Sequence, residues 1–204
     1  MIPEVKKDLT DWRLGRVVSV MDRGFMSEDN LTELQKAGGH YIIGERMRSG
    51  KQHVEEALSR RGRYQELREN LHVKEIEVGD GERRIRYILA RNPLEAERQK
   101  RLREKALEEI RAELREKPSA KRICELVAHQ TYGRYLKLDE NGKAGIDPDK
   151  VRQEERLDGK YLIRTSDDTL TAEDVALGYK QLLEVEDAFR ALKTHLELRP
   201  STIV

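Results

Sequence analysis

Apolar and polar positions near the N-terminus predict an α/β unit. Residues 16–22 (RVVSVMD) form a short, β-branched run of strand length that ends at an aspartate. Ser27 is a predicted cap for a helix that ends at the Gly38-Gly39 pair, and residues 41–43 form a second short buried strand. A strand, a helix and a strand in this order predict a right-handed βαβ unit with parallel strands.

The pattern changes between residues 47 and 168. Residues 73–78 and 83–90 flank a Gly-Asp-Gly turn and predict a β-hairpin, because the first arm alternates strictly. Residues 94–116 predict a long helix whose many Glu/Arg pairs at three or four residues' spacing indicate a solvated surface. Other predicted elements are helices at 52–61 and 121–129 and the strands of a second small sheet at 134–138 and 160–166. The pattern assigns no structure to residues 147–159.

A helix near the C-terminus carries the most informative polar positions. Thr171 is a predicted cap with Asp174 at the third helical position. At about 100° per residue, four side chains fall within an arc of roughly 60°: Tyr179, Leu182, Glu186 and Lys193. An adjoining apolar stripe consists of Val175, Leu182, Val185, Phe189 and Leu192. The stripe places Glu186 at the margin of a buried face, although a surface helix with scattered charges has the same periodicity.

Composition narrows the class of protein. The 204 residues are 39% charged and 37% hydrophobic with a net charge of only +1, so any nucleic-acid surface must be a local patch. The single cysteine, Cys124, excludes an internal disulfide and a cysteine-built zinc site, and its apolar surroundings predict a packed structural thiol. No apolar run reaches the ~18 residues of a membrane span, and the N-terminus lacks a signal peptide's apolar core. We therefore expect a soluble, cytoplasmic protein.

Three segments together resemble the DDE transposases of bacterial insertion sequences. The segment VVSVMDRGF, with Asp22 and Arg23 at the end of a strand, is similar to the family's second catalytic aspartate segment, and HYIIGERMR resembles the strand that follows it. The family signature on the last helix is Tyr, two residues, Arg, three residues, Glu, six residues, Lys. Tyr179, Glu186 and Lys193 match it, whereas Leu182 replaces the arginine. The replacement weakens an expected phosphate contact and leaves the carboxylate in place.

The resemblance implies a site that cuts and joins DNA at insertion-sequence ends. Members of this family hold two divalent ions, Mg²⁺ or Mn²⁺, with three carboxylates on a ribonuclease H-like fold. Asp22 and Glu186 are then metal ligands and catalytic residues. The resemblance also implies that Tyr179 and Lys193 of the signature contact DNA phosphate. Candidates for supporting contacts with the DNA are Arg23, Arg190 and His195. A nucleoid-associated bacterial protein is the expected setting.

The resemblance also predicts the domain organisation. We expect a partial ribonuclease H-like core at residues 1–46, a mixed α+β insertion at 47–168 and a return helix of the core at 169–204. The family's first aspartate lies on an upstream strand, whereas Asp8 and Asp11 lie in no strand-like context. We therefore expect an N-terminally truncated fragment that does not catalyse transposition alone. An incomplete sheet would expose a strand edge, which predicts a homo-oligomer.

Two other classes of protein remain open on the sequence alone. The charged helix at 94–116 is also typical of a non-enzymatic scaffold that pairs with a partner helix. A DNA-binding module that occupies transposon ends without cutting them is the other alternative. Locally, Asp22 is equally well interpreted as a turn-former or a helix N-cap. Metal dependence distinguishes an enzyme from a scaffold, and salt-dependent DNA binding distinguishes the binding module.

Overall fold

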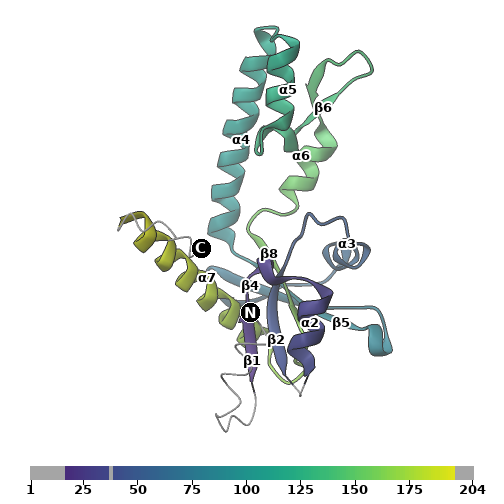
Figure 1. The fold of residues 1–204 in the computed structure, drawn as a ribbon, viewed down its shortest axis with the longest axis vertical. Coiled ribbons are helices and arrows are strands. Elements are labelled where there is room, and N and C mark those ends of the chain that lie inside the picture. The colour runs from purple at the N-terminus through teal and green to yellow at the C-terminus, as the bar shows by residue number, and fades with distance from the viewer. Residues whose placement is uncertain (1–16, 37–38, 196–204) are drawn as a thin grey trace, which may run out of the picture. The chain divides into compact units, whose positions relative to one another are not determined.

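The computed structural model describes residues 17–36 and 39–195, and these fall into two compact units (Figure 1). The first unit combines the part of the chain up to residue 90 with the part from residue 161 onward. The second unit is residues 91–160. The core, insertion and return helix predicted with boundaries near residues 46 and 168 stay a prediction.

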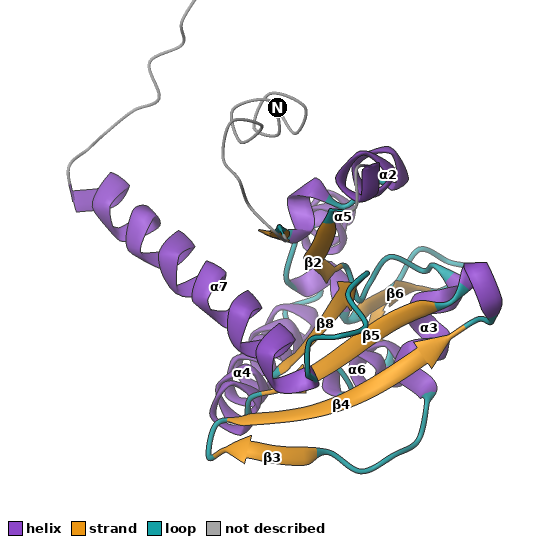
Figure 2. Cartoon of the chain, turned by 90° about the horizontal axis from the view of Figure 1, so that it is seen from below, coloured by secondary structure: helices purple, strands orange, loops and turns teal. Residues whose placement is uncertain are grey.

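A six-stranded sheet forms the centre of the first unit (Figure 2). Its spatial order is β1 (Val18–Met21), β2 (His40–Glu45), β8 (Lys160–Thr165), β5 (Ile85–Arg91), β4 (Leu71–Val78) and β3 (Gln65–Arg68). β1 and β2 are parallel, and β2 and β8 are antiparallel. Among the described strands β1 lies at one edge of the sheet, where the sequence predicts that a second copy of the chain binds; that oligomer stays a prediction.

The βαβ unit predicted near the N-terminus is present. Ser27 caps α2 (Glu28–Gln35) by accepting a hydrogen bond from the backbone N–H of Asn30 at 3.2 Å. Leu31 and Leu34 are buried on the face of α2 that meets the sheet. Burying each leucine stabilises the fold by roughly 1.5–3 kcal/mol, so this contact fixes the helix between its two strands. The α/β fold class is confirmed.

Helices cover both faces of the sheet because the side chains of each strand alternate. On β2, Tyr41 and Ile43 pack under α2, whereas Ile42 faces α7 (Ala172–His195). α3 (Gln52–Ser59) packs on the same face as α2, through Val54 and other buried side chains. The first unit is therefore a three-layer α/β/α structure, with α7 alone over one face among the described helices.

The predicted second small sheet was wrong for residues 160–166. β8 lies inside the main sheet, where Ile43 of β2 pairs with Arg164 and Gly44 pairs with Ile163. The hairpin of β4 and β5 belongs to the same sheet. A short strand's own pattern shows that it is buried but does not identify its partner, since pairing is set by tertiary contacts.

The second unit is built mainly of helices. It contains α4 (Pro93–Arg115), α5 (Ala120–Ala128), α6 (Pro148–Glu155) and a small sheet of β6 (Leu136–Leu138) and β7 (Ala144–Ile146). Its core joins Ala106, Leu107 and Ile110 of α4 to Leu126 of α5 and to Tyr135 and Leu136. The apolar face of α4 is thus used within its own unit, which counts against the partner-helix scaffold. No helix in the described part of the chain has the length and hydropathy to cross a membrane.

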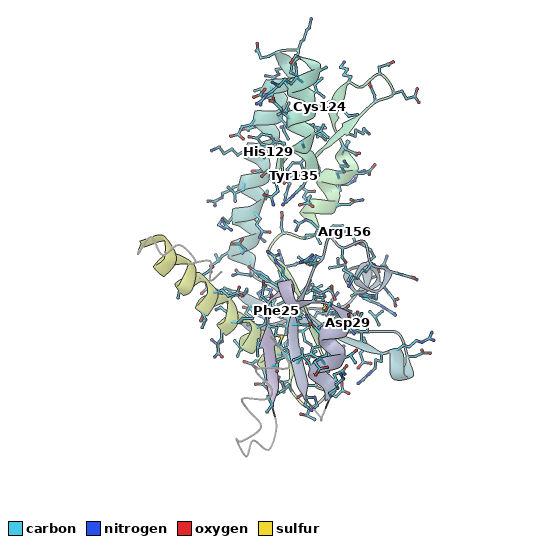
Figure 3. All side chains as sticks on the ribbon, viewed as in Figure 1. Phe25, Asp29, Cys124, His129, Tyr135 and Arg156 are labelled. Carbon is cyan, nitrogen blue, oxygen red and sulfur yellow. The ribbon has the colours of Figure 1, made fainter. Side chains whose placement is uncertain are left out.

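Two features of this unit differ from the sequence expectations. Cys124 is exposed on α5 rather than packed, because the buried face of that helix is centred on Leu126 (Figure 3). The unassigned residues 147–159 contain α6. Asp147 caps it by accepting from the N–H of Asp149 at 2.9 Å, and Pro148 is at its first position. That Asp-Pro start was the available signal, but the helix lacks an apolar stripe.

Candidate active site

Asp22 lies where β1 ends, at the carboxyl edge of the two parallel strands. Its backbone is extended, and its carboxylate accepts a 3.4 Å hydrogen bond from the N–H of Gly24 as the cap of a short 3-10 helix, η1 (Arg23–Phe25). The local interpretation of Asp22 as a helix cap is therefore confirmed, and its role as a metal ligand stays a prediction. The carboxyl ends of parallel strands are where α/β sheets bind ligands.

Tyr179 packs against the neighbouring strand from α7. The helix starts with the predicted capping box, in which Thr171 and Asp174 each accept a hydrogen bond from the other's backbone N–H, at 3.1 and 3.3 Å. Two turns later Tyr179 is only 5% exposed, and its ring lies on the backbone of Gly44 in β2. The helix start and the strand together hold this side chain at the sheet's edge.

Three of the predicted site residues affect the pKa of Tyr179. The pKa of its hydroxyl is raised to about 12, mainly by burial and then by the carboxylate of Asp22; Arg23 lowers it, and Glu186 makes a smaller raising contribution. Asp22 and Glu186 are far apart in sequence, yet both act on the same phenol. Asp22, Arg23 and Glu186 therefore lie near enough to Tyr179 to act electrostatically on its hydroxyl.

Glu186 lies on α7 about two turns beyond Tyr179 and is half-buried. Within the described residues it has no hydrogen-bond or ion-pair partner, and Asp22 has only the N–H of Gly24. Carboxylates that lack a cationic partner are candidate oxygen ligands for a divalent cation. This charge arrangement is the chemical signal of the site.

The other candidate residues have less defined positions. Arg23 is exposed in η1, beside Asp22. The backbones of Arg190 and Lys193 belong to α7, while their side chains, and that of His195, lie outside the described residues. DNA contacts by these residues and by Tyr179 stay predictions.

The apolar stripe predicted along α7 is correct only in part. Val175 is buried and Leu182 is half-buried against the same core cluster as Ile42, so the position that is arginine in the signature supports packing here. Val185 is 52% exposed. Within the described part of the chain the sheet does not cover Val185, because the second half of α7 extends beyond it (Figure 2). The side chains of Phe189 and Leu192, the other members of the predicted stripe, lie outside the described residues.

The donor set fits a hard divalent cation. Mg²⁺ prefers oxygen ligands and is commonly held by one or two carboxylates together with waters and substrate phosphates. Asp22 and Glu186 supply carboxylates of this kind. Residues 17–36 and 39–195 bring together no group of three or more acidic, histidine or cysteine side chains around one point. Joint ligation of a metal ion by Asp22 and Glu186 stays a prediction.

Sequence reasoning missed Gly44. It lies in the segment HYIIGERMR, and nothing in a local pattern shows that a glycine there makes room for a side chain from a distant helix. Its position after three buried residues of a strand was the available signal, because glycine inside a strand often marks the close approach of another group.

Comparison with protein families agrees with this geometry. The family of the transposase DDE domain matches residues 3–202, which is nearly the whole chain. Neither the curated proteins nor the solved structures give a significant match. The matched family consists of DNA transposases, which generally use divalent metal ions. The chain therefore belongs to the DDE transposase family.

Proposed function

We propose that Asp22 and Glu186 hold Mg²⁺ or Mn²⁺ for phosphodiester cleavage and joining at the ends of an insertion sequence. The observation that supports this proposal is the contact of Tyr179 with Gly44: Gly44 is level with Asp22 on the neighbouring strand, and Glu186 follows Tyr179 on the same helix. Neither carboxylate has a hydrogen-bonded or ion-paired cation among the described residues, so the oxygens of both could ligate a divalent ion. When bound, such an ion activates the attacking hydroxyl and offsets charge on the leaving oxygen.

The side chains around the two carboxylates have separable roles in this proposal. Arg23 is exposed at the same edge and would neutralise a phosphate of the DNA. Tyr179 stays protonated at neutral pH because its pKa is about 12, so it can donate a hydrogen bond but cannot serve as a general base. A divalent ion held by Asp22 and Glu186 would make the attacking hydroxyl easier to deprotonate, so this phenol is not required as a base.

We further propose that the chain alone cuts DNA poorly. Two-ion catalysis in this family relies on three carboxylates, and no group of three or more acidic, histidine or cysteine side chains surrounds one point within residues 17–36 and 39–195. Fewer ligands weaken metal binding and leave one of the two ions without its usual protein support.

DNA nicking tests this proposal. The purified chain is incubated with insertion-end DNA in Mg²⁺ or Mn²⁺, beside Glu186→Gln. Glu184→Gln is the matched control, because Glu184 is an exposed acid on the same helix that pairs with Lys180 at 3.7 Å. We expect all three to show the same low activity. Robust nicking that Glu186→Gln abolishes and Glu184→Gln retains would overturn the proposed inactivity and support the metal ligand.

A DNA-binding module without cleavage is the second candidate, and one observation favours it. Arg23 at the end of β1 is exposed, as are Arg46 and Lys51 in the segment after β2. The two strands are parallel and adjacent, so these cations gather at one edge of the sheet. A gel shift with insertion-end DNA over a range of salt concentrations tests it, since phosphate contacts weaken as salt rises.

A further inference from the structure

The contact between Gly44 and Tyr179 leaves no room for a side chain on β2. A Cβ added at Gly44 would lie 2.1 Å from the Tyr179 hydroxyl oxygen and 2.7 Å from its Cζ. Ordinary contacts of a Cβ begin near 3.4 Å, so the phenol would have to move by more than about 1 Å. The ring is held on one side by this strand and on the other by its own helix.

Position 44 requires glycine because Tyr179 leaves no space for a side chain, and not because of its backbone conformation. Gly44 lies within β2 and is not among the described glycines with positive φ, so an alanine could adopt the same backbone. A second glycine at the same contact behaves differently. A Cβ on Gly178 of α7 would lie 3.7 Å from Cδ1 of Ile42, which is an ordinary van der Waals distance.

The register of the sheet puts Asp22 beside this contact. Met21 pairs with Ile43, so Asp22 follows at the level of Gly44 on the adjacent strand, about 4.8 Å away. The Tyr179 hydroxyl, which lies against Gly44, is therefore next to the Asp22 backbone. This geometry accounts for the electrostatic contact between the two side chains.

We propose that Gly44 is a positioning residue: by lacking a side chain it lets Tyr179 rest on β2 and so sets where α7 presents Glu186 relative to Asp22. Glu186 is seven residues further along a continuous helix, about 10 Å along its axis. A displacement at Tyr179 is carried to Glu186 because the helix moves as a body. The inference rests on the proposed metal site.

Mn²⁺ affinity measured by electron paramagnetic resonance tests this role. Gly44→Ala should weaken Mn²⁺ binding by about tenfold or more, since a misplacement of 1 Å is costly at such a site. Gly178→Ala is the matched control, at the same helix-strand contact but with room for the methyl group, and should bind like the wild type. An unchanged affinity in Gly44→Ala would overturn the proposal.

A double-mutant cycle separates positioning from general damage. Tyr179→Ala removes the ring that collides with the new methyl group, so adding Gly44→Ala in that background should change Mn²⁺ affinity less than twofold. The single Gly44→Ala variant keeps its tenfold loss. Equal losses in both backgrounds would show that Gly44 acts independently of Tyr179 and would overturn the proposal.

A readout without metal distinguishes this inference from the proposed function. In protein labelled with 3-fluorotyrosine, the ¹⁹F resonance of Tyr179, assigned by its loss in Tyr179→Phe, should shift in Gly44→Ala and stay in Gly178→Ala. If wild type shows no Mn²⁺ binding that depends on Glu186, the proposed function fails. The ¹⁹F shift then still supports the positioning contact, and an unshifted resonance overturns it.

Discussion

The carboxylate of Asp22 raises the pKa of Tyr179, although the two residues lie at opposite ends of the described chain. The parallel pair of β1 and β2 places Asp22 at the level of Gly44, and α7 lays Tyr179 on that glycine. The contact therefore links the first strand of the sheet to the last helix.

Tyr179 predicts a loss of stability at high pH. Its pKa is about 12 in the fold and near 10 in an unfolded chain, so the folded state keeps the proton more tightly between these values. The stabilisation is complete below pH 10 and is lost as the pH rises through 12. Between pH 10 and 12 the unfolding free energy of Tyr179→Phe should therefore fall by about 2 kcal/mol less than that of the wild type. Urea unfolding at several pH values measures it, and an unchanged slope would contradict the stated surroundings of Tyr179.

We expect the buried carboxylate of Asp167 to stabilise the segment that leads into α7. It is fully buried, and one carboxylate oxygen accepts hydrogen bonds from the N–H and hydroxyl of Thr169 and from the N–H of Leu170, at 2.8, 3.0 and 3.1 Å. Asp167→Ala leaves these donors unpaired, so unfolding free energy should fall by about 2–3 kcal/mol. Asp168→Ala is the control. Asp168 is exposed and pairs with Arg84, so its loss should cost under about 1 kcal/mol.

We expect the ion pairs of Arg103 to stabilise the second unit. It is only 5% exposed and forms ion pairs with Asp158 and, at 3.3 Å, with Glu155. Arg103→Met leaves a partly buried carboxylate without its cation, and unfolding free energy should fall by about 2–3 kcal/mol. Arg98→Ala on the same helix removes a pair whose arginine is 65% exposed, and should change it by less than about 0.5 kcal/mol. Equal effects in thermal unfolding would show that burial of Arg103 does not matter.

Arg23 predicts a salt-dependent contribution to DNA binding. Arg23→Ala removes one exposed cation at the sheet edge, so affinity should fall several-fold at low salt and the slope of log affinity against log salt should shrink by about 1. Arg60→Ala, an exposed residue of the same unit that pairs with Glu56, should leave the slope unchanged. A fluorescence anisotropy titration measures both, and identical slopes in wild type and Arg23→Ala would rule out the contact.

Local patterns predicted the elements that carry the site. The β-branched run before Asp22, the Ser27 cap and the Thr171–Asp174 box all encode structure within a few residues, and the structure contains each of them. The helix of Glu186 was also predictable from its period. These features depend on short-range hydrogen bonds and burial, which a sequence pattern reports directly.

The features that the sequence missed depend on distant contacts. The strand at 160–165 pairs with β2, so its own residues are not sufficient to predict its place in the main sheet. The place of Cys124 on the outer face of α5 depends on which side of that helix meets α4. Gly44 has meaning only through Tyr179. In each case the deciding neighbour is remote along the chain.

The central claim is that Asp22 and Glu186 share a divalent ion. Crystals of the chain grown or soaked in Mn²⁺ provide the direct test, since anomalous scattering locates the metal. The account predicts a peak within about 2.2 Å of a carboxylate oxygen of both residues, lost in Glu186→Gln. A saturating soak that gives no peak between them, or a peak bound elsewhere and unaffected by that substitution, would contradict it.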